Sequence, residues 1–170
     1  MQASCASVKS ISMSSTDTQI VTLISLFRRT SQLMVTELVE RLAAAGYPDI
    51  STAAHPVFEN IDPDGTRLTE LAARSDMTHQ SMGELVATLE QRGYLERRPD
   101  PTDGRARLVC LTPKGRELVR ISLREIAAIE ADWTRSWKRA GLASDLRDPL
   151  ERAVYHRNGT ATRAKTTPDS

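Results

Sequence analysis

The sequence holds few of the residues on which metal centres and catalytic sites depend. Its 170 residues include two cysteines and three histidines. The histidines, His55, His79 and His156, stand in no metal-ligand spacing such as His-x-x-x-His, and neither a Gly-rich phosphate loop nor a nucleophile elbow occurs. Because an enzyme needs such a constellation, we expect a protein with no catalytic residues, no metal and no cofactor.

The two cysteines are too few for a disulfide framework, which is consistent with free thiols in a reducing compartment. Cys5 precedes any predicted structure, so it lacks the ordered neighbours that stabilise a redox-sensing thiolate. Cys110 alternates with Val109 and Leu111, which fit the core side of a strand, and it is therefore expected to point outward. An outward thiol leaves open an enzyme or alkyl-acceptor protein that uses Cys110.

Net positive charge and long apolar runs are also scarce. The formal charge is only +1, so nucleic-acid binding has to rest on local clusters of Arg and Lys rather than on overall charge. No apolar run approaches the roughly 18 residues that span a bilayer, and the Ser-rich start lacks the apolar middle of a secretory signal. We therefore expect a cytoplasmic protein with no membrane partner.

The most informative stretch, residues 78–94, is predicted to be a capped amphipathic helix. Thr78 is a good N-cap residue, and Gly93 can adopt the left-handed conformation that ends a helix. One face carries an apolar stripe, and the opposite face carries small or hydrogen-bonding groups, which a helix in a DNA groove needs. An ordinary surface helix remains the alternative for this stretch alone. The stripe is Met82, Leu85, Val86 and Leu89; the candidate DNA contacts are Thr78, His79, Gln80, Ser81, Gly83, Glu84 and Ala87.

The neighbouring segments predict a helix-turn-helix followed by a wing. Residues 69–75 form a short helix with Thr69 as its expected cap, and the break at Asp76-Met77 joins it to the next helix. Residues 94–99 and 106–111 are β-type runs on either side of a loop, 100–105, with Pro and Asp-Gly turn signals. Residues 66–68 are a candidate third strand. Basic residues gather around this hairpin: Arg92, Arg97, Arg98, Arg105, Arg107, Lys114 and Arg116.

Several motifs in this order resemble the multiple-antibiotic-resistance regulator (MarR) family of bacterial winged-helix transcription factors. They are Leu68-Thr-Glu-Leu-Ala, Thr78-x-Gln-Ser-Met-Gly-Glu-Leu-Val, Gly93-Tyr-Leu-Glu-Arg-Arg-Pro-Asp-Pro-x-Asp-Gly-Arg and Leu111-Thr-Pro-Lys-Gly, within Leu68 to Glu117. The resemblance implies a mainly α (α+β) winged helix-turn-helix fold with long N- and C-terminal dimerisation helices. It also implies a homodimer on a pseudo-palindromic double-stranded DNA operator. Most such proteins are repressors released by a small, often aromatic or anionic, effector.

The resemblance assigns roles to particular residues of the wing and of a cleft. Arg105 would enter the minor groove with Asp103 as its orienting carboxylate, and Arg98 and Arg107 would be further wing contacts. Phe27, His55 and Phe58 are the candidate effector pocket. Many relatives carry a basic residue where this chain has Gly83 or Glu84, and another where it has Gly104. The loss of positive charge leaves open an interaction or scaffold protein that does not read DNA.

The expected boundaries follow from helical periodicity and its breaks. Residues 1–16 and 158–170 are predicted to be disordered tails around one domain, 17–157. Within it, a long helix runs from Asp17 to Gly46. The winged helix-turn-helix lobe covers 51–112 and begins with a helix that Ser51 caps and that Pro56 makes short or bent. The helices of 113–157 comprise one over 113–139, started by Thr112 and Pro113, and one over about 144–156.

The helix over 113–139 carries a heptad-like seam that predicts a second copy of the chain. Its length exceeds what one small lobe can cover, so part of the seam is expected to meet a partner. Packing of the first and last helices within a single chain is the alternative. The seam is Val119, Leu123, Ile126, Glu130, Trp133, Trp137 and Ala140, and the predicted interface is Ile20, Leu23, Ile126, Trp133 and Trp137.

Overall fold

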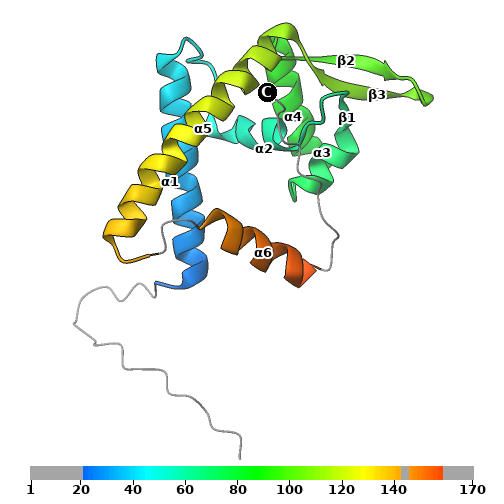
Figure 1. Cartoon of the computed structure of the whole chain (residues 1–170). Coiled ribbons are helices and arrows are strands. Elements are labelled where there is room, and N and C mark those ends of the chain that lie inside the picture. Colours follow the sequence, from blue (N-terminus) through cyan, green and yellow to red (C-terminus); the bar gives the residue numbers. More distant parts are fainter. Residues whose placement is uncertain (1–20, 143–145, 159–170) are drawn as a thin grey trace, which may run out of the picture. The chain divides into compact units, whose positions relative to one another are not determined.

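A computed structural model describes residues 21–142 and 146–158 (Figure 1). The chain divides into two compact units, 1–33 and 34–170. The described part is mainly helical with one three-stranded antiparallel sheet, as predicted. The helices are α1 (Leu23–Ala44), the 3₁₀ turn η1 (Thr52–Ala54), α2 (His55–Asn60), α3 (Leu68–Arg74), α4 (His79–Gln91), α5 (Pro113–Arg139) and α6 (Arg147–Asn158); the strands are β1 (Thr66–Arg67), β2 (Leu95–Asp100) and β3 (Asp103–Leu111).

Helix α1 begins at Leu23, six residues later than the predicted start at Asp17. The start is set by a reciprocal cap: the Ser25 amide donates to Thr22 Oγ1 at 3.1 Å, and the Thr22 amide donates to Ser25 Oγ at 3.0 Å. The predicted interface residue Ile20 lies outside the described residues. The first unit exposes an unusual number of large apolar side chains, which are Val21, Leu23, Ile24, Leu26, Phe27 and Leu33.

The core of the second unit joins the helices to one face of the sheet. The apolar stripe of α4 lies at its centre, since Met82 and Val86 are fully buried and Leu89 nearly so. Helices α1 and α5 contribute from outside the lobe through Leu42, Leu118 and Ile129. Burial of these side chains is the main term that holds α4 in place and so determines which of its faces meets solvent.

The wing is longer and its turn tighter than the sequence predicted. The strand order is β1-β3-β2, and β2 and β3 form a hairpin that extends away from the helices of this unit (Figure 1). The predicted loop of 100–105 is wrong, because only Pro101 and Thr102 separate the two strands. Asp100 closes the turn: its Oδ1 accepts from the Thr102 amide at 2.8 Å and from the Thr102 hydroxyl at 2.7 Å.

Two predicted caps are not formed. Helix α3 begins at Leu68 rather than at a cap on Thr69, because the chain passes directly from β1 into the helix, with Arg67 in extended conformation. Ser51 precedes the turn η1 and makes no cap hydrogen bond. Of the two alternatives for the helix around Pro56, the short one is confirmed: α2 has 6 residues, and Pro56 stands in its first turn, where no amide donor is needed.

Cys110 is buried, which contradicts the prediction that it points outward. Alternation along β3 assumed one covered face, yet Val109, Cys110 and Leu111 are all buried. The second face is covered by the loop that leads into β1: Cys110 Sγ lies 3.8 Å from the Asp64 carbonyl oxygen, and a Cβ on Gly65 would meet Sγ at 2.5 Å. Burial raises the pKa of the thiol. The exposed nucleophile on which the alkyl-acceptor alternative depended is therefore absent.

Candidate nucleic-acid interface

Helix α4 has the cap, the buried stripe and the end that its sequence predicted. Thr78 Oγ1 accepts from the Ser81 amide at 3.1 Å and donates to Ser81 Oγ at 2.9 Å. Gly93 has φ +75°, and the Tyr94 amide then donates to the Leu89 carbonyl at 2.9 Å. Both hydroxyls at the start of the helix are thus engaged in capping, so Thr78 and Ser81 hold the helix as much as they face outward.

The solvent face of α4 presents a hydrogen-bonding pair. His79, Gln80 and Glu84 are exposed, and Gln80 Nε2 donates to Glu84 Oε1 at 3.2 Å. Gly83 and Ala87 are half-buried. A Cβ on Gly83 would stand 3.7 Å from Leu68 Cδ2, so this position faces α3 rather than open solvent.

The turn between α3 and α4 relies on a non-glycine residue in the left-handed region. Asp76 has φ +50°, and the Met77 amide donates to the Ala72 carbonyl at 2.9 Å. This is the hydrogen bond of a Schellman ending. It sets the angle between the two helices of the helix-turn-helix.

Two of the four arginines on the β2–β3 hairpin are paired within the chain. Arg98 Nη2 lies 2.5 Å from Glu96 Oε1, and Arg97 Nε lies 3.2 Å from Glu90 Oε1. Arg105 and Arg107 are exposed, and within the described ranges their guanidinium groups make no hydrogen bond or ion pair. Free positive charge is therefore concentrated in the part of β3 nearest the turn.

The aspartate beside Arg105 contacts the Arg105 backbone rather than its side chain. Asp103 Oδ1 accepts from the backbone amide of Arg105 at 3.1 Å, and no contact joins the Asp103 carboxylate to the Arg105 guanidinium among the described residues. Asp103 thus orients the backbone of the wing and leaves the Arg105 side chain available.

Sequence reasoning missed a further residue that contacts the wing, Arg67, which comes from β1. Its Nε donates to Asp100 Oδ2 at 2.8 Å, and its Nη2 lies 2.6 Å from the same oxygen. Asp100 is buried, with 6% of its surface exposed. Hydrogen bonds from Thr102 and then from Arg67 lower the pKa of Asp100 to about 2. The ion pair joins positions 33 residues apart, and no local motif signals it.

The remaining basic residues of the predicted cluster donate hydrogen bonds to backbone carbonyls near the start of β2 and the end of β3. Lys114 Nζ lies 4.0 Å from the centre of the Tyr94 ring and donates to the Arg92 carbonyl at 2.8 Å. Arg92 donates to the Asp49 carbonyl, and Arg116 donates to the Leu111 carbonyl at 2.7 Å. The available positive surface is smaller than the count of arginines and lysines predicted.

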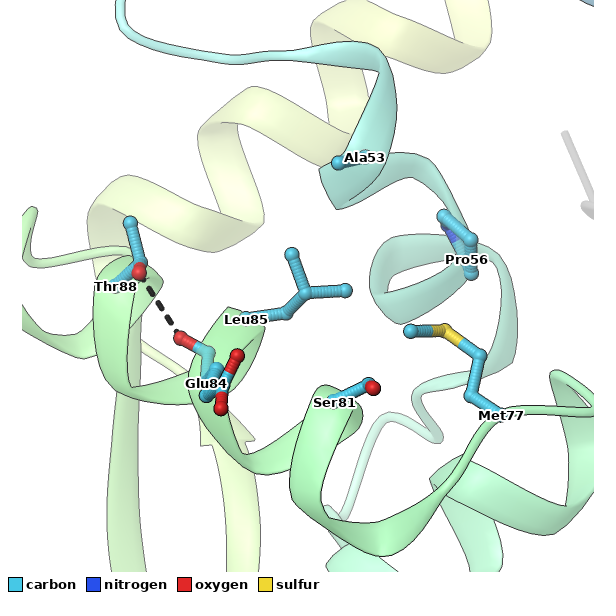
Figure 2. A pocket seen from close by; sticks show the side chains of 7 residues that line it. All are labelled: Ala53, Pro56, Met77, Ser81, Glu84, Leu85 and Thr88. Atoms are coloured by element: carbon cyan, nitrogen blue, oxygen red, sulfur yellow. Dashed lines mark hydrogen bonds between the residues drawn. The ribbon is translucent and has the colours of Figure 1, made fainter.

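A pocket of about 500 Å³ opens beside α4 (Figure 2). Leu85 extends into it from the helix, Met77, Pro56 and Ala53 form the facing apolar wall, and Glu84 lies at the helix side, where Thr88 donates to the Glu84 carbonyl at 2.9 Å. The lining residues are Ala53, Pro56, Met77, Ser81, Glu84, Leu85 and Thr88. Two of them, Ser81 and Glu84, belong to the candidate reading face.

The predicted effector residues lie elsewhere. His55 Nε2 lies 3.6 Å from a Glu59 carboxylate oxygen on the next turn. Phe58 packs edge-on against Tyr94, with 6.4 Å between the ring centres, and belongs to the core. Phe27 is exposed in the first unit. Neither His55 nor Phe58 lines the pocket, so their role as effector ligands stays a prediction. Among the described residues no group of three or more His, Cys, Asp or Glu could hold a metal, and no helix could span a membrane.

Part of the predicted seam of α5 is used within the chain. Ile126 and Trp133 pack against the core, and Trp133 Nε1 donates to Glu37 Oε2 at 3.1 Å. Arg41 pairs with Asp132 at 2.9 Å across the same contact. Leu123 is 63% exposed, and Trp137 is half-buried beside Trp133. Ile126 and Trp133 therefore make contacts within their own chain, as the single-chain alternative expects, and their place in a dimer interface stays a prediction; Leu123 is exposed.

Comparison with known proteins agrees with this geometry. Residues 49–106 match the model of the MarR family. An uncharacterized HTH-type transcriptional regulator of Mycobacterium leprae is 35% identical over 84 residues, which are 49% of this chain and 55% of that protein. The chain thus spans about half the length of the curated relatives it matches.

Solved structures extend the likeness of fold beyond the lobe. CouR of Rhodococcus jostii, bound to p-coumaroyl-CoA, matches with a TM-score of 0.64 at 18% identity over 84% of this chain and 95% of CouR. S. aureus MepR, in a complex with DNA, matches with a TM-score of 0.59 at 20% identity over 82% of this chain and 98% of MepR. Residues 49–106 are thus similar in sequence to the MarR family, and the solved structures show that the chain has a winged helix-turn-helix fold.

Proposed function

We propose that the protein is a transcriptional regulator that reads double-stranded DNA, with α4 in the major groove and the β2–β3 hairpin against the minor groove. One observation carries the proposal: a capped helix presents exposed His79, Gln80 and Glu84 next to a wing whose Arg105 and Arg107 are free. A side chain such as Gln80 can pair with a base edge, and an arginine suits a narrow groove of negative potential.

The charge distribution favours sequence-specific rather than indiscriminate binding. Arg97 and Arg98 are neutralised by Glu90 and Glu96, and Glu84 adds negative charge to the reading face. Few cations are left to replace counterions along the phosphates, so non-specific affinity should be low. Contacts between α4 and the base edges then have to supply a large share of the preference for the operator over other DNA sequences.

A homodimer on a pseudo-palindromic operator fits the exposed apolar surface of the first unit. Leu23, Ile24 and Phe27 are at least half exposed, and clustered apolar surface of this kind marks an interaction site. Two-fold symmetric reading would place the half-sites about one helical turn apart. We expect the protein to be a repressor, because a protein bound to an operator prevents other proteins from binding the same DNA.

An effector could act through the pocket of Figure 2. Its apolar wall suits an aromatic ring, and an occupant would touch Ser81 and Glu84 and so compete with DNA. MepR and CouR, similar in fold, are known in complexes with DNA and with a small molecule respectively. Glu84 is the single charged lining residue, so an anionic ligand such as salicylate is disfavoured there relative to a neutral one.

The test is a binding experiment on DNA from directly upstream of the protein's own coding region. A near-palindrome there is placed in a fluorescent duplex, and anisotropy is measured with the full chain against operator and scrambled duplexes at several salt concentrations. The proposal expects operator binding to be stronger by a factor of about 10³ or more at physiological salt. Equal affinity for both duplexes would favour the alternative, a winged-helix interaction protein that does not read DNA, for which the negative charge of Glu84 is the favouring observation.

A further inference from the structure

The wing turn is tied to β1 by a single guanidinium group. Arg67 contacts Asp100 through Nε at 2.8 Å and through Nη2 at 2.6 Å, and its Nη2 also lies 3.6 Å from Asp103 Oδ2. Asp100 and Asp103 are the last residue of β2 and the first residue of β3. One side chain from the strand that precedes the helix-turn-helix therefore bridges both ends of the wing turn.

Each of the two carboxylates divides its oxygens between Arg67 and the wing backbone. Asp100 gives Oδ2 to Arg67, while its Oδ1 accepts from the Thr102 amide at 2.8 Å. Asp103 turns Oδ2 toward Arg67, while its Oδ1 accepts from the Arg105 amide at 3.1 Å. The position of Arg67 is thereby coupled, through two carboxylates, to the backbone that carries Arg105.

The end of the hairpin has little other support. Strand β1 pairs with β3 only at Thr66↔Val109 and Arg67↔Leu108, so from Arg107 to the turn β3 has β2 as its single partner in the described sheet. A two-stranded ribbon by itself is marginally stable in water. Asp100 is in addition 6% exposed, and a buried carboxylate without its cation is costly.

We propose that Arg67 is a positioning residue of the wing, which fixes the turn of the β2–β3 hairpin and so directs Arg105 toward DNA. The proposal rests on the DNA-binding function proposed above, but its structural half concerns the free protein. Arg67 acts through Arg105: its guanidinium is committed to two carboxylates and is not the group that contacts phosphate.

The first measurement needs no DNA. Amide hydrogen exchange of the full-length free protein is compared with that of Arg67→Gln, which removes the cation and keeps a polar side chain. The Thr102 and Arg105 amides should exchange about tenfold faster, because the carboxylates that accept from them lose their anchor. Arg74→Gln is the matched control: Arg74 is paired with Asp62 at 2.7 Å in the same unit, and its loss should leave both amides unchanged. Unchanged exchange in Arg67→Gln would overturn the proposal.

The second measurement separates positioning from direct contact. Binding to the operator duplex is measured for Arg67→Gln, Arg105→Ala and the double variant. Arg67→Gln should weaken binding by about three- to tenfold, and it should add little in the Arg105→Ala background, because both changes remove the same contact. Arg67→Lys should recover only part of the loss, since an ammonium cannot reproduce the two-point contact. Losses that multiply in the double variant would assign Arg67 a DNA contact of its own and contradict the proposal. If no variant and no parent protein binds any duplex, the proposed function fails, while the exchange result still decides the role of Arg67 in the wing.

Discussion

At the scale of single residues, Asp76 is the residue whose backbone fits its side chain least well. Three helices are followed by a glycine with positive φ: α1 by Gly46, α4 by Gly93 and α5 by Gly141. After α3, the residue with positive φ is Asp76, at +50°. Glycine occupies that region without the steric cost that a Cβ brings.

Replacing Asp76 with glycine is therefore expected to stabilise the folded protein. Asp76→Gly should raise the free energy of unfolding in urea by about 0.5–1 kcal/mol, because the left-handed strain is removed. Gly93→Ala is the reverse case: its φ is +75° and nothing lies within 4 Å of the added Cβ, so a loss of about 1–2 kcal/mol would come from the backbone alone. A destabilised Asp76→Gly protein would contradict this explanation of the turn.

Asp100 should make stability depend on pH in a defined direction. Its pKa in the folded chain is about 2, below the ordinary 3.8, so the folded state binds this proton less readily than the unfolded state. The stabilisation that the ionised Asp100 carboxylate contributes is fully present above about pH 4 and is lost as the pH falls through about 2. The variant Asp100→Asn has no carboxylate at this position and so lacks this pH-dependent stabilisation. The difference in urea unfolding free energy between parent and Asp100→Asn should therefore shrink between pH 5 and pH 2, and a difference that stays constant would refute the assignment.

Contacts between residues close in the sequence could be predicted, whereas contacts between distant residues could not. The caps at Thr78 and Thr112 act on amides three residues away, so a local pattern was enough to identify both. The Arg67–Asp100 pair spans 33 residues. The face of β3 that carries Cys110 was wrongly expected to be exposed for the same reason, because the residues that cover it, around Asp64, come from a distant loop.

At the scale of elements, the positions of the helices and strands were predicted well where one apolar stripe decided them. Helix α5 has the predicted bounds. Helix α4 buries three residues of the predicted stripe, Met82, Val86 and Leu89, whereas the fourth, Leu85, is half-buried and lines the pocket. The hairpin turn was placed too broadly, because Pro101 and Asp103-Gly104 both signal turns, and the choice between them depends on the carboxylate of Asp100. The face of α4 left open to solvent follows directly from the stripe that is buried.

Two helical glycines should respond in opposite ways to an added methyl group. Gly83 lies inside α4, and its Cβ would make an ordinary contact with Leu68 Cδ2 at 3.7 Å, so Gly83→Ala should stabilise by up to about 1 kcal/mol. Gly115 lies in the first turn of α5, and its Cβ would stand 2.2 Å from the Tyr94 carbonyl oxygen. Gly115→Ala should cost about 1–3 kcal/mol or prevent folding. Urea denaturation of both variants checks the prediction, and a loss of stability in Gly83→Ala would show that α4 and α3 pack more closely than described.

At the scale of the whole molecule, assembly is the first question. We expect sedimentation of the full chain at micromolar concentration to give a homodimer, twice the 18.8 kDa of one chain. Ile24→Glu is the sharpest disruption, because Ile24 is 81% exposed and its loss should not harm folding. Trp133→Glu is a poor choice, because Trp133 packs against the core of its own chain. A parent protein that sediments as a monomer and still binds the operator with full affinity would rule out the dimer.

The matched pair of Gln80→Ala and Arg105→Ala tests the central claim most directly, because the helix and the wing should fail in different ways. With operator and scrambled duplexes titrated at several salt concentrations, Gln80→Ala should cost about 1–3 kcal/mol on the operator and almost nothing on scrambled DNA. Arg105→Ala should weaken binding to both duplexes where they are rich in A·T, and it should reduce the slope of log affinity against log salt by about one counterion. If both variants bind both duplexes as the parent protein does, then α4 is not the reading helix and the β2–β3 hairpin is not a DNA-binding wing.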